Sequence, residues 1–169
     1  MEKPAFDPLD PPTARNPLPA YGSAPSMRLL QDLVRVPRHE RTRPLNPEMQ
    51  ALLLEIEAAL SASLTPATAH EIRDAVLGLL SHYPTRAMST TERVSVARDW
   101  LTDLAVVPTD IIAAACQEWR RRPNAFAPTP GHLLELIGPA LAARRFQHRM
   151  ASEWLAAQHR VANEESERT

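Results

Sequence analysis

Acidic and histidine side chains are the first candidates for chemistry in this sequence. His70 and Glu71 are followed by Asp74, close to the zinc-binding pattern H-E-x-x-H but with an aspartate where the second histidine is needed. Asp99 and Asp103 are four residues apart, a spacing at which two carboxylates can share a metal ion or a proton. No third acid or histidine lies one turn from that pair. We interpret both groups as exposed helix faces and predict no metal site.

The other reactive residue types form no catalytic pattern either. Cys116 is the single cysteine, which excludes an internal disulfide, and it stands among apolar residues, where a thiol behaves as a small hydrophobe. His132, His148 and His159 have no partner pattern. The sequence contains no G-x-S-x-G, Walker or dinucleotide motif, and its 4 glycines are too few for glycine-rich phosphate loops. We therefore predict a non-enzymatic protein without a cofactor.

Arginine is the residue type whose distribution is most informative. The formal net charge is only −1, but residues 115–150 carry six arginines against Glu118 and Glu135. If the helices that carry them lie side by side, their guanidinium groups would form a patch for phosphates or an acidic partner. The predicted contact residues are Arg120, Arg121, Arg122, Arg144, Arg145 and Arg149.

A second candidate surface lies near the C-terminus. There, four large apolar side chains recur at a spacing that places them along one narrow stripe of a helix. We expect this stripe to bind a groove of a partner protein. Its residues are Phe146, Met150, Trp154 and Leu155.

Composition predicts an all-α fold. Of the 169 residues 44% are hydrophobic but only 5% aromatic, so the core must consist of Ala, Leu, Val and Ile, as in a helical bundle. Proline divides the chain, because 10 of the 17 prolines lie in residues 1–47. We predict a disordered, Pro- and Arg-rich arm over residues 1–45 with a short helix near 26–34, then a compact bundle of four to five helices over 46–162 with a protruding C-terminal helix, and a frayed tail over 163–169. No stretch is apolar enough for a membrane span, and we expect a cytoplasmic protein.

Capping signals and apolar periodicity predict where the helices of the bundle begin. We expect helix starts at Asn46-Pro47, at Thr65-Pro66, at the capping box that begins with Ser89, at Pro108 and at Thr129-Pro130. Gly138-Pro139 should kink or divide the last helix. In the helix after Ser89, five apolar residues are expected to face the core, namely Val94, Ala97, Trp100, Leu101 and Leu104. Trp100 and Trp119 are expected to anchor the core.

The order of motifs over residues 65–137 resembles a known family. Tyr83-Pro84 precedes a helix containing Trp100, Val107-Pro108-Thr109-Asp110 opens an alanine-rich helix that ends in Trp119-Arg120-Arg121, and Ala127-Pro128-Thr129-Pro130 precedes Leu133-Leu134. This order is similar to that of the phage and prophage proteins that load and inhibit the replicative helicase. The resemblance implies a helical module that contacts replication proteins, together with a segment that binds the helicase.

We therefore expect a non-enzymatic adaptor in DNA replication that binds the replicative helicase and loads or restrains it, with DNA as a second partner. In this family the helicase-binding segment is expected last in the chain, whereas here the arm comes first. Two alternatives stay open. The chain could be a small phage or prophage regulator that binds DNA directly, or a structural or packaging accessory protein.

Overall fold

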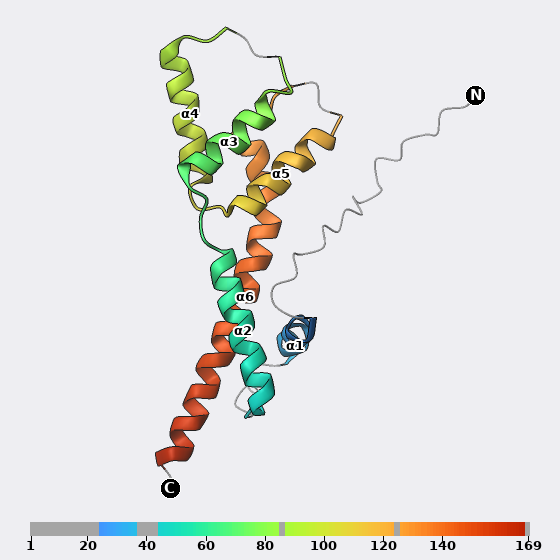
Figure 1. Ribbon diagram of the computed structural model, residues 1–169, viewed down its shortest axis with the longest axis vertical. Helices are drawn as coiled ribbons and strands as arrows, with labels where there is room; N and C mark the ends of the chain where they lie inside the picture. The colour runs from blue at the N-terminus through green and yellow to red at the C-terminus, as the bar shows by residue number, and fades with distance from the viewer. Residues whose placement is uncertain (1–23, 37–43, 85–86, 124–125, 168–169) are drawn as a thin grey trace, which may run out of the picture.

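The computed structural model describes residues 24–36, 44–84, 87–123 and 126–167, and in these ranges all regular secondary structure is helical. The helices are α1 (Ala24–Arg35), α2 (Pro47–Ser63), α3 (Ala69–Leu80), α4 (Thr90–Leu104), α5 (Thr109–Arg121) and α6 (Pro130–Glu167). The predicted all-α class is confirmed. Helix α6 runs through most of the length of the molecule, with α3, α4 and α5 around its first half and α1 and α2 beside its second half (Figure 1).

The helix starts follow the caps with one exception. Asn46 accepts a hydrogen bond from the Met49 N–H at 2.8 Å, and Ser89 forms a capping box with Glu92. The expected start at Thr65-Pro66 is wrong, because α3 begins at Ala69 behind a capping box of Thr68 and Glu71. This box satisfies two free backbone amides of the helix, whereas a proline at the first position satisfies none.

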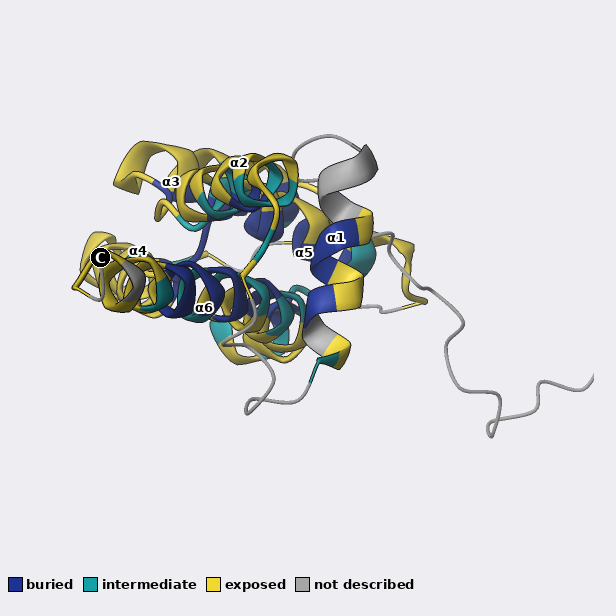
Figure 2. Cartoon of the chain, turned by 90° about the horizontal axis from the view of Figure 1, so that it is seen from below, coloured by how far each residue is buried: buried dark blue, intermediate teal, exposed yellow. Residues whose placement is uncertain are grey.

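The helices form two separate hydrophobic clusters. The first joins α3, α4, α5 and the beginning of α6, and it contains Trp100 and Trp119, each 4% exposed, which confirms both as core residues. The second joins α1, α2 and the later part of α6 around Leu53, Ile56 and Trp154. Viewed along the long axis, the buried residues form bands on α6 and on α1 (Figure 2). Helix α6 therefore belongs to both clusters.

The expected N-terminal arm is only partly described. Its short helix is confirmed as α1, while residues 1–23 and 37–43 lie outside the described residues. The predicted start of the folded part at residue 46 is wrong, because Leu29, Leu30 and Leu33 of α1 are buried in the second cluster. These three leucines form an apolar stripe. Its packing on α2 and α6 removes it from water, which stabilises the folded state.

The C-terminal helix also differs from expectation. It is a single helix that begins at Pro130 and includes Pro139 in its interior. The turn around Gly138 and Pro139 is exposed, so water can solvate the carbonyl group that proline leaves without a donor. The helix continues to Glu167, past the predicted end at residue 162, and its last turns extend beyond α2 (Figure 1).

Candidate nucleic-acid and partner surfaces

Three of the six predicted contact arginines lie together at the C-terminal end of α5. Arg120 and Arg121 occupy its last turn and Arg122 caps it, and all three are exposed. Their position at this end of α5 is favourable, because positive charges at a helix C-terminus interact favourably with the helix dipole. Arg122 also lies 3.7 Å from the Glu118 carboxylate. The three guanidinium groups are accessible to an anionic ligand.

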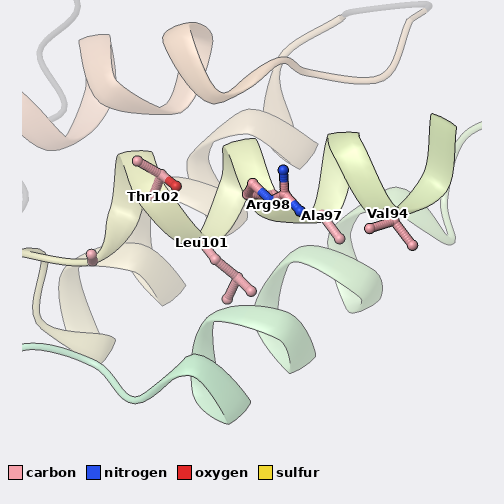
Figure 3. Close-up of a pocket in the computed structure, with 6 residues that line it drawn as sticks. Val94, Ala97, Arg98, Leu101 and Thr102 are labelled. Carbon is pink, nitrogen blue, oxygen red and sulfur yellow. The ribbon is translucent and has the colours of Figure 1, made fainter. Parts of the chain in front are cut away.

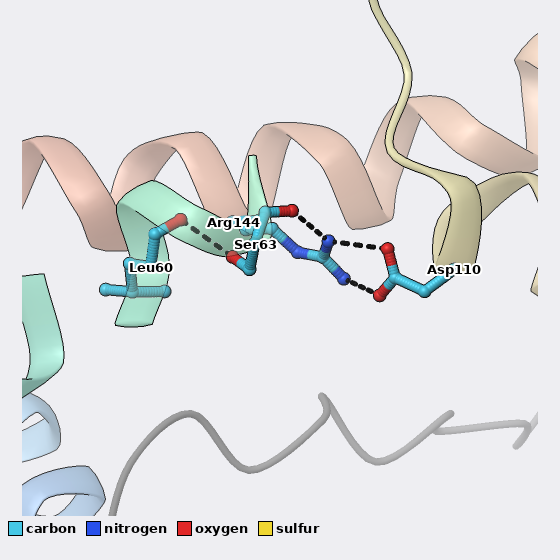
Figure 4. A network of polar contacts seen from close by, with 4 residues as sticks. All are labelled: Leu60, Ser63, Asp110 and Arg144. Carbon is cyan, nitrogen blue, oxygen red and sulfur yellow. Dashed lines mark hydrogen bonds and ion pairs between the residues drawn. The ribbon is translucent and has the colours of Figure 1, made fainter. Parts of the chain in front are cut away.

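Arg144 is not part of that surface, and its prediction as an external contact is wrong. Its side chain is 4% exposed, and its guanidinium donates to both carboxylate oxygens of Asp110, at 2.9 and 2.6 Å. It also donates to the backbone carbonyl of Ser63 at 2.8 Å (Figure 4). Arg144 thus ties the first turn of α5 and the last turn of α2 to α6 and links the two hydrophobic clusters.

The single patch of six arginines therefore does not form. Asp110 and Arg121 lie at opposite ends of α5, and at 1.5 Å per residue the helix separates them by about 16 Å. Because Arg144 pairs with Asp110, it lies beside the N-terminal end of α5. Arg145 and Arg149 are exposed on the same part of α6 as Arg144, and the Arg149 guanidinium lies 5.6 Å from the centre of the Phe146 ring. Of the six predicted contact arginines, three lie at the C-terminal end of α5, two are exposed on α6, and Arg144 is buried.

The predicted apolar partner stripe is mostly covered by the chain itself. Phe146 is 41% exposed, but Met150, Trp154 and Leu155 are 4%, 3% and 9% exposed and pack in the second cluster against α1 and α2. The indole N–H of Trp154 donates to the backbone carbonyl of Leu33 in α1 at 3.2 Å. Their prediction as external contacts is wrong, because the stripe faces helices of its own chain.

An aromatic group beside Arg120–Arg122 was missed in the sequence. The Trp119 ring stacks on His132 with their centroids 4.9 Å apart, and the exposed Phe126 meets Trp119 edge to face at 5.9 Å. The Arg122 guanidinium lies 5.9 Å from the centre of the Trp119 ring. We call Arg120, Arg121, Arg122, Phe126 and His132 the arginine–aromatic corner. These residues belong to α5, to the turn after it and to α6. Only the packing of α5 against α6 brings them together.

Local polar contacts shape this corner. His132 Nδ1 accepts the backbone N–H of Thr129 at 3.1 Å at the start of α6, whose first turn carries no acidic residue. The positive end of the helix dipole therefore adds to the field of the arginines. The buried Trp119 Nε1 has no hydrogen-bond partner among the described residues. The corner offers three guanidinium groups and a helix N-terminus to an anion, with one exposed aromatic ring beside them.

The residues considered for metal chemistry lie at a helix cap or on exposed helix faces. Glu71 accepts the Thr68 backbone N–H at 2.8 Å, a hydrogen bond that lowers the pKa of the carboxyl, and His70 lies 3.1 Å from Asp74 on the helix surface. Asp99 and Asp103 are exposed on α4. Within the described part of the chain, no three metal-ligating side chains gather.

Cys116 is buried in the first cluster. It is 3% exposed, and its thiol lies 3.9 Å from the Ala75 carbonyl oxygen. Burial raises the pKa of the thiol, since removal from water disfavours the thiolate. The nearby Arg120 acts in the opposite direction with a smaller effect. The side chain serves as a core residue, as its apolar neighbours in the sequence predict.

Comparison with known proteins adds no assignment to this geometry. No protein-family model, curated protein or solved structure matches the chain. Among the described helices none is long and apolar enough to span a membrane. The functional argument therefore depends on the surfaces themselves.

Proposed function

We propose that this protein is a non-enzymatic adaptor of DNA replication that binds the replicative helicase and loads or restrains it, and that its arginine–aromatic corner contacts the DNA strand. The order of motifs over residues 65–137 supports the helicase as partner. The corner supports the contact with DNA, and it is the observation that carries the proposal.

The chemistry of the corner suits a single strand. Such strands are bound by positive grooves that follow the phosphates and by aromatic rings on which bases stack. Phe126 is 54% exposed, which leaves part of its ring open to a base. Arg120, Arg121 and Arg122 can then neutralise neighbouring phosphates, which would release counterions and make the affinity salt-dependent.

The DNA contact is tested by removing these charges in the full chain. The triple variant Arg120→Gln, Arg121→Gln and Arg122→Gln should lose most of its affinity for a labelled single strand, measured by fluorescence anisotropy. The slope of log affinity against log salt should also become shallower by about 2, since each lost phosphate contact contributes about 0.7.

A matched triple variant provides the control. Arg145→Gln, Arg149→Gln and Arg160→Gln remove the same charge from exposed positions of α6 outside the corner. This control should retain its affinity and its salt slope. Equal losses in the two triples would show that net charge alone governs binding, and the corner would then have no specific role.

The helicase contact is tested by recovery of partners from a nuclease-treated lysate of the host. The replicative helicase should be recovered with the tagged full chain. Recovery of virion proteins without the helicase would instead favour a packaging accessory. Binding to one duplex sequence far more tightly than to others would favour a DNA-binding regulator.

A further inference from the structure

His132 occupies a position in α6 that is filled by glutamate in two other helices of the chain. Glu71 in α3 and Glu92 in α4 each accept the backbone N–H of the residue three positions earlier, which caps the helix. His132 accepts the backbone N–H of Thr129 in the same way, at 3.1 Å. A neutral histidine at this position caps α6 without bringing a negative charge to the arginine–aromatic corner.

This contact determines which ring nitrogen of His132 carries the proton. A backbone N–H can only donate, so the Nδ1 atom that accepts it has no proton. The neutral ring then carries its proton on Nε2. The side chain is half-buried, and within the described part of the chain no hydrogen bond is made by Nε2. His132 therefore holds a hydrogen-bond donor that the described chain does not use.

His132 lies among the aromatic rings of the corner. Its ring stacks on Trp119 at 4.9 Å, and the Phe126 ring lies 5.7 Å away at a tilt of 52°. Trp119 is 4% exposed, and its indole N–H also has no acceptor among the described residues. Buried polar groups are nearly always paired, so unpaired donors indicate a place where an acceptor is missing. An anion with several oxygen atoms would supply such an acceptor.

The hollow on α4 lacks this combination of donors and charges. Val94 and Ala97 were expected to face the core, and this is wrong, because they are exposed on the first half of α4, where the described residues provide no core to cover them. They line a shallow groove together with Arg98, Leu101, Thr102 and Ala105 (Figure 3). The groove contains one charged group, so no array of charges there selects an anion.

We propose that the Nε2–H of His132 donates to a phosphate oxygen of the bound strand, next to the base that stacks on Phe126. This assignment rests on the proposed contact between the corner and DNA, and it names the group of the strand that position 132 recognises. Three arginines and the N-terminal end of α6 make the surroundings positive. A positive field at a helix N-terminus favours a phosphate over a neutral base oxygen as the acceptor.

Nuclear magnetic resonance of the full chain tests this contact. A long-range proton–nitrogen correlation spectrum distinguishes the two ring nitrogens of each histidine, and His132→Gln identifies the signals of His132. We expect a proton on Nε2 in the protein alone, and a shift of the Nε2 signal on saturation with a single strand of thymidines. An abasic strand, which has the same phosphates without bases, should shift the signal in the same direction. His148 is the internal control, because its Nε2 lies 3.2 Å from Glu57 of α2, outside the corner.

Two glutamate substitutions in the same turn separate the donor from the charge. His132→Glu keeps a cap of the type formed by Glu71 and Glu92 but removes the Nε2–H. Gly131→Glu adds the same charge one residue earlier and leaves His132 in place; a Cβ atom there would lie 3.8 Å from Thr129 Oγ1, an ordinary van der Waals contact. Both should weaken strand binding through repulsion. His132→Glu should weaken it about tenfold more, since it also removes a hydrogen bond to a charged group.

Four results would overturn the assignment. An unshifted Nε2 signal, while anisotropy shows the strand bound, would remove His132 from the contact and leave the proposed function intact. A shift with thymidines but not with the abasic strand would make a base the acceptor. The same shift with inorganic phosphate at the same concentration would identify a free anion as the ligand. Equal losses of affinity in His132→Glu and Gly131→Glu would leave position 132 no role beyond charge. Absence of any strand binding would instead contradict the DNA contact itself.

Discussion

The ion pair that links the two hydrophobic clusters predicts an asymmetric response to mutation. Asp110→Ala removes the carboxylate that accepts two hydrogen bonds from the guanidinium of Arg144, whose side chain is 4% exposed. Removing one partner from a buried ion pair costs about 3 kcal/mol or more of unfolding free energy, because the charge that stays buried loses this compensation. We therefore expect Asp110→Ala to lower the free energy of unfolding by about 3 kcal/mol.

Arg144→Met should cost less. It leaves the Asp110 carboxylate, which is 55% exposed, so water can replace the lost donors. The methionine retains much of the apolar stem of arginine, and the main loss is the hydrogen bond to the Ser63 carbonyl, worth about 1 kcal/mol. The double variant should be close in stability to Arg144→Met, since the buried charge is then absent.

Urea unfolding followed by circular dichroism at 222 nm measures all three variants. Glu48→Ala is the matched control, because it removes an exposed acidic residue from the first turn of α2 and should cost only about 0.5 kcal/mol through the helix dipole. If Arg144→Met proves as costly as Asp110→Ala, or costlier, the buried charge is not the source of the penalty.

The same pair gives a pH dependence with a definite sign. The hydrogen bonds from Arg144 are the largest cause that lowers the pKa of Asp110 in the folded state. A lowered folded-state pKa stabilises the protein above the unfolded pKa of about 3.9, and this contribution is lost as the pH falls through the folded pKa. The stability gap between wild type and Asp110→Ala should therefore be complete at neutral pH and narrow under acidic conditions below about pH 4.

Three further predictions concern other parts of the molecule. Phe126→Ala should weaken single-strand binding about tenfold, since one stacked base contributes about 1 to 3 kcal/mol, with only a small fall in the melting temperature from the lost edge-to-face contact with Trp119; unchanged anisotropy would exclude the ring from the contact. Trp154→Phe removes the hydrogen bond to Leu33 and should cost about 1 kcal/mol, so limited proteolysis should cut α1 faster, whereas equal cleavage rates would show that α1 is held by apolar packing alone. Cys116, with its burial and raised thiol pKa, should react with a disulfide reagent far more slowly in the native than in the urea-unfolded protein; similar rates would contradict its burial.

Local signals in the sequence predicted the helices well. The caps at Asn46 and Ser89 act at short range, and the structure contains both. The sequence was less informative about which helix faces contact one another in the folded chain. The stripe of Met150, Trp154 and Leu155 was recognised, but periodicity alone cannot tell whether an apolar face meets a partner or another helix of the same chain.

The arginines illustrate the same limit. Asp110 and Arg144 are 34 residues apart, and their pairing depends on how α5 docks on α6. The aromatic contact of Phe126 with Trp119 depends on the same docking. The exposed half of α4 is the opposite case, since its apolar stripe predicted burial that the described chain does not provide. For the arginines and for Phe126, only the fold identified what each side chain contacts.

The most direct measurement is whether the purified full chain forms a complex with the purified replicative helicase of its host. After nuclease treatment of both proteins, size-exclusion chromatography with light scattering gives the mass of each eluting species. The proposed adaptor role predicts a stable species whose mass exceeds that of the helicase alone. Separate elution of the two proteins, at concentrations well above those in the cell, would contradict the proposed function and leave the arginine–aromatic corner to be explained by another partner.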